Sequence, residues 1–112
     1  MIFVVMNEDD GSVSDALHFA TGVAVRCGDS LRDLLVPLKR EELTAFVVDQ
    51  RLLDAESATA ELVWKYAGAA LPVVVNPAIH SQKRMVSEVK AALERRERDR
   101  ETAREAERTA MV

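Results

Sequence analysis

Two short apolar runs in the sequence each end at carboxylates. Residues 2–6 lead toward Glu8 and Asp9, and residues 45–48 lead directly into Asp49. Continuous runs of β-branched and aromatic residues are typical of strands buried on both faces of a parallel sheet. Because ligands bind at the carboxyl ends of the strands in such sheets, these acids would share one small electronegative pocket. Carboxylates in a pocket that is concave and dry can serve as general acid and base.

Each of these acids also has a purely structural interpretation. Asp49 can end a strand and cap the loop or helix that follows. The stretch from Asp9 to Ser12 is good turn and cap chemistry by itself, so a solvated acidic turn competes with a binding site there.

The remaining pattern alternates strands with helices, which predicts crossovers and a parallel sheet. We expect a three-layer α/β sandwich with a four-stranded parallel sheet. Pro37 lies too far inside its helix for a first-turn proline, so a break or kink is expected there. Asp54 is the expected cap of the third helix. The expected strands are 2–6, 23–25, 45–48 and 71–75, and the expected helices lie at about 12–22, 31–38, 55–67 and from 80 to beyond 100.

Composition narrows the functional class. The 112 residues suffice for one domain, 48% are apolar, and the net charge is −4. An acidic chain lacks the basic face that nucleic-acid binding requires, so no nucleic-acid partner is expected. No stretch reaches the ~20 apolar residues that span a bilayer, so no membrane insertion is expected. The single cysteine, Cys27, excludes an internal disulfide and fits a reducing compartment, so we expect a cytoplasmic protein.

The segment from Gly22 (GVAVRCGDSLRDLL) and the later segment TAFVVDQRLL resemble the receiver domain of bacterial response regulators, a CheY-like, flavodoxin-like fold. The resemblance covers roughly residues 2–78. It implies that Glu8 and Asp9 (or the pair one position earlier) hold Mg²⁺ and that Asp49 is the phosphoacceptor. The chemistry is coherent, since Mg²⁺ prefers hard oxygen ligands and neutralises charge on a transferred phosphoryl group.

Three departures from the receiver pattern affect this assignment. The phosphate-sensing hydroxyl after strand 4 is replaced by Asn76 and Pro77, and Leu53 stands where receivers often have proline. The fifth strand, with its phosphate-gripping lysine, is missing, and Lys83 lies on the last predicted helix. The resemblance is therefore to a degenerate receiver without the conventional switch.

A second resemblance fits the shortened architecture. The small F subunit of V/A-type ATP synthases has four strands and ends in a helix after strand 4, as the stretch VVVNP at 73–77 and the helix after it suggest here. The Gly-Asp after strand 1 and the Gly-Phe-x-Leu-Ala-Gly stretch of that family are not present. This resemblance implies a stalk subunit of a rotary ATPase.

Two further features concern partners. Trp64 and Tyr66 cannot both lie on the core stripe of their helix, so at least one is expected to be exposed as a contact surface; a ring lying flat on its own helix is the alternative.

We divide the chain into a receiver-like α/β domain at 1–93 and a charged helical extension at 94–112. The extension is expected to be a solvated helix or a partner-binding helix.

The sequence thus predicts a non-enzymatic regulatory module that binds protein partners, possessing no cofactor unless the acidic pocket holds Mg²⁺. A rotary-ATPase stalk subunit is the alternative. A small enzyme that uses the strand-end acids is the third class.

Overall fold

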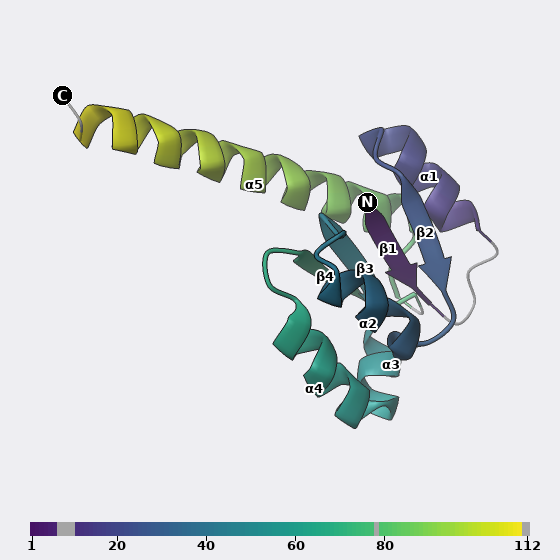
Figure 1. Ribbon diagram of the computed structural model, residues 1–112. Coiled ribbons are helices and arrows are strands. Elements are labelled where there is room, and N and C mark those ends of the chain that lie inside the picture. Colours follow the sequence, from purple (N-terminus) through teal and green to yellow (C-terminus); the bar gives the residue numbers. More distant parts are fainter. Residues whose placement is uncertain (7–10, 78, 111–112) are drawn as a thin grey trace.

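The computed structural model describes residues 1–6, 11–77 and 79–110 (Figure 1). Four parallel strands form one sheet in the order β2-β1-β3-β4. The strands are β1 (Ile2–Val5), β2 (Val25–Gly28), β3 (Ala45–Asp49) and β4 (Leu71–Val75). The helices are α1 (Ser12–Thr21), α2 (Leu31–Lys39), α3 (Gln50–Ala55), α4 (Ser57–Tyr66) and α5 (Gln82–Ala110). The predicted four-stranded parallel sheet and the long C-terminal helix are confirmed.

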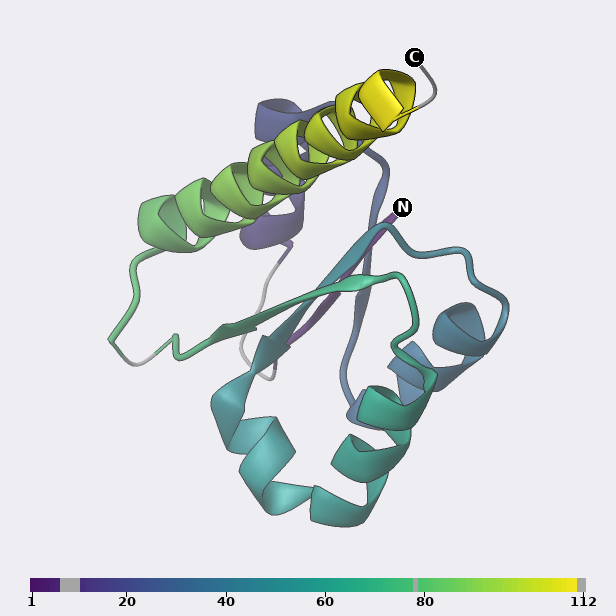
Figure 2. The ribbon, with the colours of Figure 1, turned by 90° about the vertical axis from the view of Figure 1, so that its left-hand side faces the viewer.

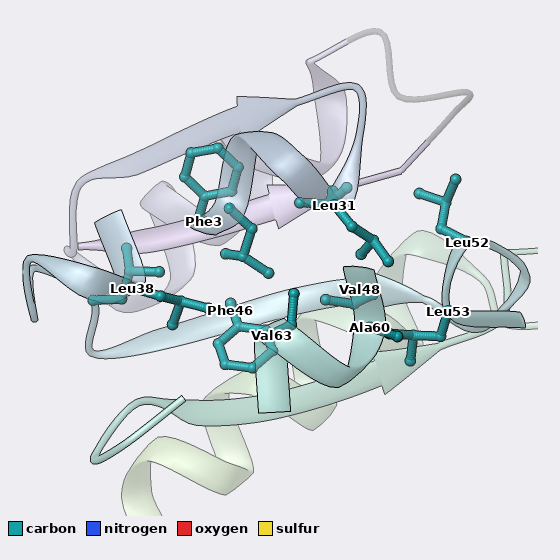
Figure 3. Close-up of a cluster of buried hydrophobic side chains, with 12 residues drawn as sticks. Phe3, Leu31, Leu38, Phe46, Val48, Leu52, Leu53, Ala60 and Val63 are labelled. Carbon is teal, nitrogen blue, oxygen red and sulfur yellow. The ribbon is translucent and has the colours of Figure 1, made fainter. Parts of the chain in front are cut away.

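Two apolar clusters cover the two faces of the sheet and make the fold three-layered (Figure 2). On one face, Phe3 and Phe46 pack against α2, α3 and α4 (Figure 3). On the other face, Ile2 and Val47 pack against α1 and α5. Every residue of β1 and β3 is buried, because both strands are central and covered on both sides. This explains why their sequences are continuously apolar instead of alternating.

The second strand lies later in the sequence than predicted. We expected residues 23–25, but β2 pairs with β1 from Val25 to Gly28. Gly28 is the last residue of β2. A Cβ at Gly28 would lie 2.9 Å from the Phe3 ring and from the Asp33 Cβ, so glycine allows α2 and β1 to approach this strand.

The segment after β3 forms two helices where one was predicted at 55–67. Helix α3 begins directly after Asp49, whose carboxylate caps it, so Asp54 is not the cap. Glu56 has non-helical dihedral angles (φ −117°, ψ 55°) and separates α3 from α4. The turn at Glu56 allows Leu52 and Leu53 of α3 to join the same core cluster as Ala60 of α4.

The expected interruption at Pro37 does not occur, because α2 continues through Pro37 to Lys39. The helix then ends in a Schellman motif, in which Glu42 N donates to Pro37 O (3.1 Å) and Glu41 N donates to Leu38 O (3.1 Å). Glu41 occupies the left-handed position of this motif with φ 56°. The proline therefore lies within one turn of the C-terminal end of α2.

Strand β4 matches its predicted bounds and forms one edge of the sheet. Leu71 N donates to Thr44 O at 3.0 Å, so the nitrogen of the next residue, Pro72, faces the free edge of the sheet. A proline at this position removes no hydrogen bond from the ladder between β3 and β4.

Helix α5 starts on the body and projects beyond it (Figure 1). Met85 and Val89 are buried against the sheet. Further along the helix, the guanidinium of Arg96 donates to Thr44 O at 3.0 Å and to Ala69 O. The helix continues through the predicted boundary at 93/94, where Arg96 is half-buried and residues 97–107 are all exposed. No helix in the described part of the chain combines the length and apolar character needed to cross a bilayer.

We predict that Glu41→Gly stabilises the fold by about 0.5–1 kcal/mol, because glycine adopts the left-handed conformation without the steric penalty of a Cβ. Chemical denaturation measures the free energy of unfolding. Glu42→Gly is the matched control, since Glu42 does not have a positive φ, and it should leave stability unchanged or lower it. Equal effects of the two substitutions would contradict the motif.

Candidate functional site

The site is at the carboxyl edge of the sheet, where β1 and β3 end side by side. Val5 of β1 pairs with Val48 of β3, so Asp49 lies one position beyond the last paired residue of β1. The chain order reverses between these strands, since β2 lies on one side of β1 and β3 on the other. In open α/β sheets this reversal creates the crevice where ligands bind. The topology therefore places Asp49 where the sequence predicted a pocket.

Asp49 is fully buried, and both of its carboxylate oxygens are occupied. Oδ1 accepts a hydrogen bond from the backbone N of Arg51 (2.9 Å), which makes Asp49 the N-cap of α3. The guanidinium of Arg51 donates through Nε to both oxygens (3.2 Å each) and through Nη2 to Oδ2 (2.8 Å). A forked contact of this kind is among the strongest pairings available to a carboxylate.

The pairing results from local geometry. Asp49 is the last residue of β3 and has extended dihedral angles (φ −71°, ψ 125°), as N-cap residues do. Arg51 is the second residue of α3, so the helix start itself brings the Arg51 side chain back over the strand end. The Arg51 side chain is 44% exposed, and it therefore covers the buried carboxylate with a charge that water still solvates.

A buried carboxylate without a partner is costly because it loses its hydration. Arg51 supplies the compensating charge. This arrangement lets the side chain of Asp49 be buried at a strand end. Both oxygens of the carboxylate accept hydrogen bonds from Arg51.

The predicted metal ligands Glu8 and Asp9 lie outside the described residues, so the magnesium site stays a prediction. The described part of the chain contains no group of three or more His, Cys, Asp or Glu side chains able to hold a metal ion. Asp49 is the one residue of the predicted acidic pocket whose surroundings are defined.

The end of β4 lies at the same edge, because Asp49 pairs with Val75. After Val75, the backbone N of Asn76 donates to His80 Nδ1 (3.1 Å), and His80 N donates to Asn76 O (2.8 Å). These bonds close the loop where receivers carry the phosphate-sensing hydroxyl. Lys83 is exposed on α5.

Trp64 and Tyr66 are both partly exposed on α4, at 45% and 36%, so the prediction that at least one is exposed is confirmed. The Trp64 ring lies 6.2 Å from the Phe46 ring, measured between centroids, and is tilted by 49°. The two aromatic residues are separated by two positions, so they lie on different sides of α4. They therefore belong to two surfaces of the molecule.

Sequence reasoning missed Arg51 as the partner of Asp49. The signal was present as an Asp-x-Arg spacing at the start of a helix, but the helix was predicted to begin at residue 55. When Asp49 is the N-cap, the side chain of the second helical residue, Arg51, can reach back and donate to the Asp49 carboxylate.

Comparisons with known proteins identify no relative. No family model matches the sequence, and no curated protein or solved structure matches it significantly.

The pairing predicts an asymmetry between its two partners. Arg51→Ala leaves a buried carboxylate uncompensated and should destabilise the fold by about 2–4 kcal/mol. Asp49→Asn removes the buried charge and keeps a capping oxygen, so it should cost less, about 1 kcal/mol. The double variant should be more stable than Arg51→Ala alone. Urea denaturation measures all three, and a double variant that is less stable than Arg51→Ala would contradict the pairing.

Proposed function

We propose that the protein is a regulatory protein-interaction module that resembles a degenerate receiver and performs no enzymatic turnover. The observation that carries this proposal is the occupied carboxylate of Asp49. A phosphoacceptor must present an oxygen to the phosphoryl group, whereas the carboxylate of Asp49 is buried beneath the guanidinium of Arg51. A module of this kind would bind partners in one fixed state instead of responding to phosphorylation.

The sheet order supports the receiver-like part of the proposal. The arrangement β2-β1-β3-β4, with every pair parallel, corresponds to the first four strands of the doubly wound order 2-1-3-4-5. The described residues contain no fifth strand, and α5 follows β4 directly. Fold-level likeness of this kind carries function only by analogy.

Two surfaces are available for partners in this proposal. The first is the exposed part of α4, where Trp64 and Tyr66 lie on different sides of the helix, since partly exposed aromatic residues are enriched where proteins contact one another. The second is the part of α5 beyond Arg96, whose sequence is rich in charged residues. Helix α5 projects from the body (Figure 1). We place the protein in the cytoplasm, with protein partners and no nucleic-acid partner.

The alternative function is that of a small stalk subunit of a V/A-type rotary ATPase. The observation that favours it is a four-stranded sheet followed directly by a helix of 29 residues that extends away from the body. A projecting helix is suited to contact a neighbouring subunit in a larger assembly. Gene neighbourhood separates the two proposals, with histidine kinases expected for the first and ATPase catalytic subunits for the second.

Incubation with Mg²⁺ and acetyl phosphate should produce no lasting mass increase of one phosphate, because Arg51 occupies the Asp49 carboxylate. Intact-protein mass spectrometry measures the adduct, and an active receiver domain treated in parallel is the positive control. A stable adduct that disappears in Asp49→Ala would contradict the proposal.

An affinity pull-down should recover a protein partner. Two variants of the protein then locate the surface to which this partner binds. The first ends the chain at Asp99, which retains the contacts of Arg96 with the body. The second is Trp64→Ser. We expect one of them to lose the partner and Lys90→Gln, an exposed change elsewhere on α5, to retain it. Recovery that is unchanged in both variants would exclude these two surfaces.

A further inference from the structure

A cavity lies at the amino edge of the sheet, opposite the edge that contains Asp49. It has a volume of about 440 Å³ and lies where the C-terminal ends of α2 and α4 approach each other. Its boundary includes the loops that lead into β3 and β4. We name it the amino-edge cavity and define it by Lys39, Glu41, Leu43, Lys65, Tyr66 and Ala70. Its volume is within the range of small-molecule sites.

Two ammonium groups converge on one aromatic ring in this cavity. Lys39 Nζ lies 4.9 Å from the centroid of the Tyr66 ring, and Lys65 Nζ lies 5.5 Å from it. Both distances are within the range of cation–π attraction. No carboxylate in the described ranges is close enough to either lysine to form an ion pair, although Glu41 also lines the cavity.

A structural explanation covers part of this arrangement. Lys39 is the last residue of α2 and Lys65 is in the last turn of α4, and positive charges near helix C-termini are stabilising. That effect accounts for each lysine separately. It does not explain why both ammonium groups lie within cation–π distance of the same ring and line the same cavity. An anion bound in this cavity would be attracted by both ammonium groups.

We propose that the amino-edge cavity binds a small organic anion, with Lys39 and Lys65 holding the anionic group and Tyr66 and Leu43 contacting an apolar or aromatic body. The anionic group is a carboxylate or a phosphate ester, since both accept charge-assisted hydrogen bonds from ammonium groups. The apolar part fits a wall built from the Tyr66 ring and the buried side chain of Leu43. This site is separate from Asp49 and does not depend on the function proposed above.

The test is a titration of the full chain with phenyl phosphate and, separately, with benzoate. NMR chemical shifts of the backbone amide protons and nitrogens report binding. Saturable shifts confined to residues 38–43 and 65–70, with a dissociation constant of about 1 mM or below, are expected for at least one probe. Benzyltrimethylammonium carries a similar ring with the opposite charge and should produce no saturable shift there. Tighter binding of phenyl phosphate assigns a phosphate ester as the ligand class, and tighter binding of benzoate assigns a carboxylate.

Matched variants separate this site from nonspecific attraction to positive charge. Lys39→Gln with Lys65→Gln should weaken binding by about tenfold for each ammonium group removed. Lys83→Gln with Lys90→Gln changes the net charge equally at exposed positions of α5 and should leave binding unchanged. Glu41→Gln should strengthen binding, because it removes the one carboxylate among the residues that define the cavity.

The proposal is overturned if neither anion saturates by about 10 mM, or if the Lys39/Lys65 variant binds as tightly as the unchanged protein. It is also overturned if the Lys83/Lys90 variant loses binding to the same extent. The amide spectrum of each variant shows whether it is folded, and these exposed lysine substitutions leave the core clusters intact.

Discussion

The ion pair between buried Asp49 and partly exposed Arg51 is the interaction on which the carboxyl edge of this protein depends. Asp49 has no exposed surface, yet its carboxylate ends a central strand and caps the next helix. Burial of that charge is tolerable only because Arg51 N, Nε and Nη2 all donate to it. The same contacts define the start of α3, which positions Leu52 and Leu53 in the core. The contacts between Asp49 and Arg51 therefore end β3, begin α3 and neutralise the buried charge at the same time.

The pairing with Arg51 changes how Asp49, the acid at the end of β3, should be interpreted. At the reversal point of an open α/β sheet, a carboxylate is normally placed to meet a ligand or a metal ion. Here a side chain from the same chain provides the positive charge. The reading of Asp49 as a helix cap, which the sequence left open beside that of a phosphoacceptor, agrees with the observed hydrogen bonds. The amino edge has the opposite character, because two lysines there converge on one ring and form no ion pair within the described ranges.

Sequence patterns predicted the sheet well because burial on both faces leaves a simple signal. Residues 2–5 and 45–49 are apolar almost throughout and became the two central strands, and β4 has its expected bounds. The errors occurred where tertiary contacts overrode local signals. The strand expected at 23–25 pairs with β1 from Val25 to Gly28, where the close approach of Phe3 favours glycine. Pro37 looked like a helix breaker, but a Schellman motif ends α2 just beyond it. The position of Asp49 followed from strand order, whereas its partner Arg51 could not be identified until the start of α3 was known.

The central claim is that Arg51, and not a bound ligand, neutralises Asp49. A crystal structure of the protein grown with Mg²⁺ and beryllofluoride, a mimic of a phosphoryl group, tests it most directly. The account predicts that the guanidinium of Arg51 stays within hydrogen-bonding distance of both Asp49 oxygens and that no beryllofluoride is bound to Asp49. Beryllofluoride bound to an Asp49 oxygen, with Arg51 displaced and Mg²⁺ beside it, would contradict the account.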